Sequence, residues 1–171
     1  LQGKKLWEQK IGQQRGGKHK MGSGSNPSPV TDGKHVWVYF KSGDFACLDF
    51  GGKVVWQTNL QSKFGDDTLW WDLGTSPVLT REHVVVACMQ EGPSYLAAFG
   101  KIDGKLAWKE DRTFDVPKEN DQSYTTPIVT LRDGVEEIIV LGADHVTGHN
   151  ASTGKQIWQV GGLNPGNAGY W

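Results

Sequence analysis

Short runs of apolar and β-branched residues alternate along this chain with turns that contain glycine, aspartate or serine. One set opens at Pro29 and continues through residues 36–40, 45–50 and 54–58. The same order returns at 77–80, 83–89, 95–99 and 106–109, and again at 127–131, 137–142, 146–150 and 156–160. Runs of this length between tight turns predict antiparallel strands and exclude long helices. We therefore expect three units of four strands, with no helix beyond a turn or two between them.

Two sequence motifs repeat in phase with these units. The motif Gly-Lys-x-apolar-Trp ends at Trp7, Trp56, Trp108 and Trp158, and Ser/Thr-Pro-apolar begins at Ser28, Ser76 and Thr126. Both motifs return after about 50 residues, a period typical of repeat architectures. Two independent motifs that share one period over the whole chain indicate an internal repeat.

A four-stranded unit of this length, repeated, predicts an all-β fold, the β-propeller, in which each unit is one blade. The expected boundaries are a blade end at 1–11, blades at 28–60, 76–109 and 126–160, and the start of the next connection at 161–171. A closed propeller needs at least about four blades. We therefore expect about three consecutive blades of a larger propeller of seven or eight, with the other blades supplied by the same parent chain.

The recurrent tryptophans are predicted to be structural. Each ends the outermost strand of a unit, where a large flat ring can fill the gap to the adjacent blade. The residue ten positions earlier is small in the three full units: Ala46, Ala98 and Gly148. Trp7, Trp56, Trp108 and Trp158 are therefore expected to dock blade against blade.

These motifs resemble those of a known family. The stretches from Ala46 to Trp56 and from Gly148 to Trp158 are similar to the tryptophan-docking repeat Ala-x-Asp-x-x-Thr-Gly-Lys-x-x-Trp of quinoprotein-type (PQQ-like) propellers. The likeness is greatest to the non-enzymatic, BamB-like members of bacterial envelopes. The aspartate departs from the pattern in every unit: Asp49 is displaced by one position, and Gly100 and Asn150 replace it in the others. The resemblance implies a periplasmic or otherwise extracytoplasmic location.

Composition and charge exclude several classes of function. The net charge is −1, with 18 Lys and Arg against 19 Asp and Glu, so no overall field favours nucleic acid. The hydrophobic fraction is 37% and no apolar run approaches the roughly 20 residues of a transmembrane segment. Cys47 and Cys88 lie in strand-like runs and are best interpreted as buried small hydrophobes, with a disulfide or a reactive thiol as the alternatives.

No catalytic, cofactor or metal site is predicted. The resemblance implies that enzymes of this family hold pyrroloquinoline quinone with calcium, an adjacent Cys-Cys pair, a tryptophan floor and a catalytic aspartate. This sequence has no adjacent cysteines, and its acidic pairs have no spacing typical of a calcium cage. His145 and His149 stand about 13 Å apart along a strand, too far to share one ion.

The long connections between units break the repeat and are the better candidates for function. They cover 12–27, 61–75 and 110–125, with a fourth starting at 161. Their candidate binding residues are Arg15, Lys18, His19, Trp70, Trp71, Phe114, Tyr124, Tyr170 and Trp171. Exposed aromatic residues among mixed charges suit a protein or surface-polymer partner. The alternatives are that Trp70 and Trp71 plug the channel, and that the basic stretch is a solvated loop.

Two hypotheses follow. The first is a non-catalytic propeller module of the bacterial cell envelope that binds or scaffolds protein or polymer partners through its interblade loops. The second is a fragment of a PQQ-dependent dehydrogenase whose cofactor site lies outside this segment. The missing cofactor residues favour the first and leave the question of enzymatic activity open.

Overall fold

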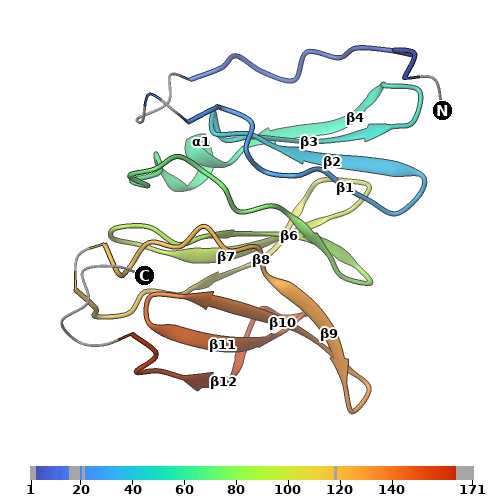
Figure 1. The fold of residues 1–171 in the computed structure, drawn as a ribbon. Coiled ribbons are helices and arrows are strands. Elements are labelled where there is room, and N and C mark those ends of the chain that lie inside the picture. The colour runs from blue at the N-terminus through green and yellow to red at the C-terminus, as the bar shows by residue number, and fades with distance from the viewer. Residues whose placement is uncertain (1–2, 16–19, 21, 118, 165–171) are drawn as a thin grey trace.

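The described residues form three four-stranded antiparallel sheets stacked one on another (Figure 1). The computed structural model describes residues 3–15, 20, 22–117 and 119–164. The first sheet contains β1 (Val30–Thr31), β2 (His35–Tyr39), β3 (Asp44–Asp49) and β4 (Val54–Asn59). The second contains β5 (Val78–Leu79), β6 (His83–Cys88), β7 (Tyr95–Gly100) and β8 (Leu106–Asp111). The third contains β9 (Ile128–Arg132), β10 (Val135–Gly142), β11 (His145–Asn150) and β12 (Gln156–Val160).

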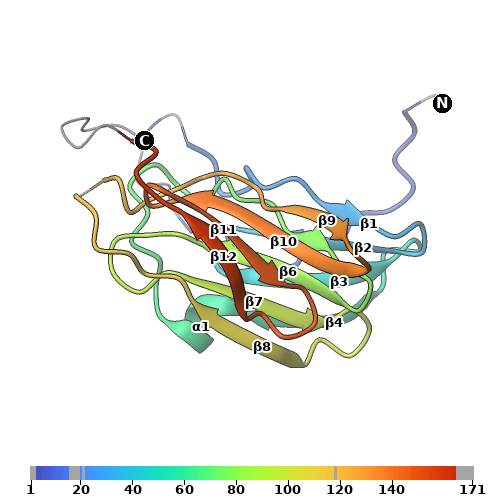
Figure 2. The same ribbon diagram turned by 90° about the horizontal axis from the view of Figure 1, so that it is seen from below.

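In each sheet the strands lie in chain order, which is the topology of a propeller blade. The sheets overlap when the stack is viewed from below (Figure 2). The predicted all-β fold is therefore confirmed. One helix, α1 (Leu60–Phe64), follows β4, and the side chain of Asn59 caps it by accepting a hydrogen bond from the Ser62 amide at 3.0 Å. This single turn agrees with the expectation of no long helix.

The sheets bury two apolar layers between them. The layer between the first and second sheets includes Trp37, Phe45, Leu60 and Phe99, and the layer between the second and third includes Leu96, Ile138 and Val140. Each such side chain contributes about 1.5–3 kcal/mol on burial. Cys47 and Cys88 are free and buried, as the interpretation of them as small hydrophobes requires.

The innermost strands are tied together at the repeated Ser/Thr-Pro motif. Strand β5 contacts both β1 and β9. The Ser76 hydroxyl accepts a hydrogen bond from the Ser28 amide at 2.8 Å, and the Thr126 hydroxyl accepts one from the Ser76 amide at 3.1 Å. The hydroxyl at this position therefore links each blade to the blade before it.

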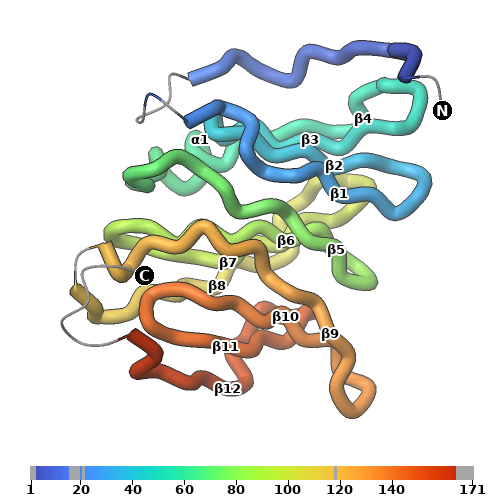
Figure 3. The backbone as a smooth tube through the Cα atoms, viewed as in Figure 1, coloured from blue at the N-terminus to red at the C-terminus, as the bar shows by residue number. Residues whose placement is uncertain are grey.

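The tube view shows two different ends of the stack (Figure 3). One end, here called the connection end, carries the β2–β3 and β6–β7 turns and the connections that lead to the next sheet. The opposite end, called the docking end, carries the β1–β2, β3–β4, β7–β8 and β11–β12 turns. Residues 3–11 run extended along the first sheet (Figure 1), in the place that the sequence assigned to the end of a preceding blade.

Candidate functional site

At the docking end, three tryptophan rings lie on the glycine turn of the next sheet. A Cβ atom added to Gly104 would lie 2.6 Å from the Trp56 ring, and one added to Gly154 would lie 2.4 Å from the Trp108 ring. The Trp7 ring lies on Gly52 in the same way. All three glycines have a positive φ. Glycine therefore serves both the turn and the close approach of the ring.

The indole nitrogens of the same three residues reach the neighbouring backbone. Trp7 donates to Phe50 O at 2.9 Å. Trp56 donates to Lys101 O at 2.7 Å, and Trp108 donates to Ala151 O at 3.2 Å. Trp158 differs, since its indole donates to the Glu137 carboxylate of its own sheet at 3.3 Å. The contacts of the first three are those that a docking role needs. Their contribution to stability stays a prediction.

The strand register places a small residue opposite three of the rings. Trp108 pairs with Ala98 and Trp158 with Gly148, as the spacing of ten residues predicts. Trp56, however, pairs with Cys47, and Ala46 pairs with Gln57. The turn from Asp49 to Lys53 is one residue shorter than the turn from Gly100 to Lys105, so the position moves by one.

At the connection end, the described parts of the three connections are joined by polar contacts. Arg15 donates to the Gln61 side chain and forms an ion pair with Asp66 at 3.3 Å, which links the first connection to the second. The amide of Trp70 donates to Gln122 Oε1 at 2.8 Å, and the amide of Trp71 donates to the Tyr124 hydroxyl at 3.1 Å. The second connection is thereby fixed to the third.

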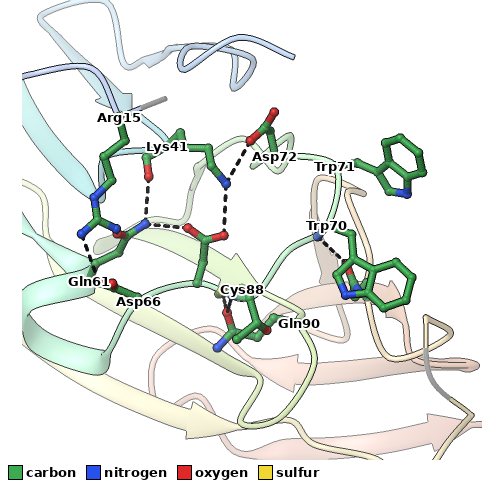
Figure 4. Close-up of polar contacts among 12 residues, drawn as sticks. Arg15, Lys41, Gln61, Asp66, Trp70, Trp71, Asp72, Cys88 and Gln90 are labelled. Atoms are coloured by element: carbon green, nitrogen blue, oxygen red, sulfur yellow. Dashed lines mark hydrogen bonds and ion pairs between the residues drawn. The ribbon is translucent and has the colours of Figure 1, made fainter. Parts of the chain in front are cut away.

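The structure brings together three of the predicted binding residues, Trp70, Trp71 and Tyr124, whereas the Arg15 side chain contacts Gln61 and Asp66. Figure 4 shows Arg15 on one side of a polar network and Trp70 and Trp71 on the other. Phe114 lies apart, stacked on His145 with ring centroids 3.9 Å apart and with the Arg112 guanidinium 5.1 Å from its own centroid. Its role as a binding residue stays a prediction. Lys18, His19, Tyr170 and Trp171 fall outside the described residues.

A buried lysine organises this network, and the sequence analysis missed it. Lys41 lies in the β2–β3 turn and is only 3% exposed. Its ammonium lies 3.2 Å from Asp67 Oδ1 and 3.1 Å from Asp72 Oδ1. Gln61 Nε2 donates to Asp67 Oδ2 at 2.6 Å and to Lys41 O at 2.8 Å (Figure 4). One ammonium thus holds both ends of the segment 67–72.

This segment presents the two tryptophans to solvent. Trp70 is 41% exposed and Trp71 is 46% exposed. Asp72 follows them with φ at 77°, a value that non-glycine residues seldom adopt. Such backbone strain persists only where surrounding contacts stabilise it, and here the ion pair with Lys41 does so. The loop that carries the two indoles is therefore fixed at both ends by the ion pairs of Lys41 with Asp67 and Asp72.

A second buried cation, Arg112, ties the third connection to the third sheet. Its guanidinium donates to the Thr147 hydroxyl at 2.8 Å and to the carbonyls of Gly142 and His145 at 3.0 and 2.9 Å. Burial lowers the pKa of Arg112 to about 10. These neutral acceptors replace the water that the group loses, so Arg112 is a structural residue.

The described residues do not match the quinone site of the family's enzymes. Cys47 and Cys88 stand on β3 and β6 of different sheets, and burial raises their pKa values to about 11 and about 12. Both thiols therefore stay protonated at neutral pH and are poor nucleophiles. Among the described residues, no three His, Cys, Asp or Glu side chains gather in a way that could hold a metal ion. Nor does any helix in this part of the chain have the length and apolar character needed to cross a membrane.

Known proteins share this arrangement of sheets. No curated protein matches the chain significantly. Among solved structures, BamB from Moraxella catarrhalis aligns with a TM-score of 0.57 and 17% identity, over 78% of this chain and 37% of that one. A europium-containing methanol dehydrogenase aligns with a TM-score of 0.60 and 12% identity, over 80% of this chain and 32% of that one. The quinohemoprotein alcohol dehydrogenase ADHIIG from Pseudomonas putida aligns with a TM-score of 0.60 and 15% identity, over 81% and 27%.

The chain thus spans about a third of the length of these structures, and likeness at this level of identity shows the fold alone. A match along the sequence is more specific. The PQQ-repeat family model described as outer membrane protein assembly factor BamB covers residues 1–166. This range takes in every described strand and all four repeats of the Gly-Lys-x-apolar-Trp motif, so the chain belongs to the BamB-like family of PQQ-repeat β-propellers.

Proposed function

We propose that this chain is a non-catalytic propeller module of the bacterial cell envelope that binds protein partners through its connection end. The observation that carries the proposal is the pair Trp70 and Trp71, exposed at 41% and 46% on a segment braced at both ends by buried Lys41. Large aromatic side chains on a fixed backbone lose little conformational entropy on binding and are the usual anchors of protein interfaces.

Family membership supports the class of partner and the compartment. The matching model is described as an outer membrane protein assembly factor, a name that gives proteins as what such a factor acts on. We therefore propose protein partners over surface polymers, and an extracytoplasmic location. Detection of the native parent protein in the periplasmic or membrane fraction of its source cells would support that location. Its recovery with cytoplasmic markers would contradict it.

Site-specific crosslinking tests the proposed surface. A photoreactive phenylalanine analogue placed at Trp71 should crosslink an envelope protein in extracts of the source organism. The same analogue at Phe50 is the matched control, since Phe50 is 53% exposed but stands in a turn at the docking end. The crosslinked partner should also be lost in Trp70→Ala and retained in Phe50→Ala. Equal crosslinking from both positions would refute the connection end as the binding surface.

A quinone-dependent dehydrogenase is the alternative, because two of the similar structures are such enzymes. The residues supplied by this chain do not support it, since the two cysteines are neither adjacent nor ionised. The test mixes the protein with pyrroloquinoline quinone, calcium, an electron acceptor and simple alcohols or sugars. Acceptor reduction that chelation abolishes would establish the enzyme and overturn the proposed module.

A further inference from the structure

The exposed tryptophans stand among carboxylates. The Trp70 indole Nε1–H donates to Glu91 Oε2 at 3.3 Å. The Trp70 amide is held by Gln122, and Asp121 precedes that residue in the chain. Burial and then the charge of Glu91 raise the pKa of the Asp121 carboxyl, which means that these two acids lie close enough to repel each other. The aromatic surface thus has a negative border.

The sequence of the two connections adds to this charge. The second connection, residues 61–75, contains Asp66, Asp67 and Asp72 against the single lysine at position 63. Lys41 forms ion pairs with Asp67 and Asp72, and Arg15 forms one with Asp66, whose side chain is 72% exposed. Residues 113–125 contain Asp115, Glu119 and Asp121 against the single lysine at position 118. Acidic residues therefore outnumber basic ones in the two connections that carry Trp70, Trp71 and Tyr124.

We propose, building on the proposed function, that this surface binds a lysine- or arginine-containing segment of the partner protein, with the cation placed over the Trp70 ring. Tryptophan has the strongest attraction for cations among the aromatic side chains, and carboxylates beside the ring add a coulombic contribution. The hydrogen bonds from the two backbone amides to Gln122 and Tyr124 fix the rings before binding. An anionic polymer or a nucleic acid would be repelled by the same border.

Calorimetric titration with defined peptides tests this inference. The probe is an acetylated and amidated octapeptide of alternating glycine and arginine, and the matched peptides carry glutamine or glutamate in place of arginine. The arginine peptide should bind the protein, and the other two should not. Raising the salt from about 0.05 to 0.5 M should weaken the binding, because salt screens the attraction between charges at a protein surface.

Variants separate the ring from the charges. Trp70→Leu keeps an apolar side chain but loses the π face, and should weaken binding about fivefold or more. Glu91→Gln with Asp121→Asn should weaken it about two- to fivefold. Phe50→Leu and Asp103→Asn, changes to exposed residues of the docking end, should leave binding unchanged. Thermal unfolding of each variant shows whether it is folded. If Trp70→Leu does not fold, the variant that combines Glu91→Gln with Asp121→Asn still tests the proposal.

The outcomes distinguish this inference from the proposed function. Failure of the arginine peptide to bind, equal binding of the glutamine peptide, or equal affinity in Trp70→Leu and Phe50→Leu would each overturn the basic partner. Crosslinking from Trp71 that persists in such a case would leave the protein-binding module standing with a partner of another chemistry. If neither the arginine peptide binds nor the analogue at position 71 crosslinks a partner, the connection end is not a binding surface.

Discussion

The two ends of the sheet stack are stabilised in different ways. At the docking end one contact is repeated, a tryptophan ring on the glycine turn of the next sheet with its indole bonded to a backbone carbonyl, as Trp56 and Trp108 show. At the connection end each contact occurs once, among them the Lys41 ion pairs and the Arg112 hydrogen bonds. The repeated contacts follow the period of the sequence, whereas the unique contacts join individual loops.

Loss of the Lys41 ammonium should have the largest effect of the changes considered. Lys41→Met leaves Asp67 and Asp72 as buried carboxylates without their cation, and we expect a loss of about 3–5 kcal/mol of unfolding free energy. Chemical denaturation measures it. The matched control is Lys109→Met, because the ion pair of Lys109 with Asp111 is partly exposed and should contribute less than about 1 kcal/mol. Equal losses of unfolding free energy in the two variants would mean that the stability of the connection end does not depend on the ion pairs of Lys41 with Asp67 and Asp72.

Removal of a docking ring should come next. Trp56→Ala deletes a half-buried ring and its hydrogen bond to Lys101 O, with an expected loss of about 2–4 kcal/mol. The matched variant is Trp158→Ala, whose ring in the described structure contacts only its own sheet through Glu137 and Gly148, so its loss should be smaller. Thermal unfolding of both proteins makes the comparison. A larger loss from Trp158 than from Trp56 would contradict the docking role.

The hydroxyl that links the innermost strands should contribute less. Ser76→Ala removes the acceptor for the Ser28 amide, at a cost of about 0.5–1 kcal/mol. Ser76→Thr should retain the stability of the wild type, since Thr126 accepts the equivalent bond in the next sheet. Denaturation midpoints of the two variants decide the matter. The role assigned to the hydroxyl is wrong if the threonine variant is as unstable as the alanine variant.

The smallest expected effect is a pH dependence of stability that arises from His149, whose side chain bonds to Gly154 in the β11–β12 turn. Its Nδ1 lies 2.9 Å from Gly154 O and its Nε2 lies 2.9 Å from the Thr147 hydroxyl, which already accepts from Arg112. In the neutral ring, Nδ1–H can donate to Gly154 O while Nε2 accepts from the Thr147 hydroxyl. Burial, opposed in part by the bond to Gly154 and reinforced by the Arg112 charge, lowers the pKa of His149 from 6.5.

The sign of the effect follows from linkage. Since the folded pKa lies below the unfolded one, the contribution of His149 to stability is present above about pH 6.5 and is lost as the pH falls through the folded pKa. Between about pH 7 and 5 the wild type should lose more unfolding free energy than His149→Gln. Denaturation at several pH values measures this difference. Parallel stability curves for the two proteins would show that His149 does not contribute.

The predicted domain boundaries stay a prediction, but the strand order could be derived from residues that repeat. Gly52, Gly104 and Gly154 mark the turns, and the tryptophan four residues after each marks the outer strand, because these contacts depend on local spacing that is the same in every unit. The turn between Asp49 and Lys53 is one residue shorter than its counterpart in the second sheet, and the strand partner of Trp56 is therefore one position closer in the sequence. Trp56 pairs with Cys47, nine positions earlier, whereas Trp108 pairs with Ala98, ten positions earlier.

The sequence by itself determined the blades, since a motif that returns with one period requires the same local structure each time. It also marked Trp70 and Trp71 as residues outside that period. Only the tertiary structure decided what holds them: Lys41 meets Asp67 and Asp72, and Gln122 meets Trp70, across different blades. The same holds for Phe114, a predicted binding residue that packs on His145. Such pairs form at one place each and share no spacing, so the stacking of the sheets, and no pattern along the chain, brings their partners together.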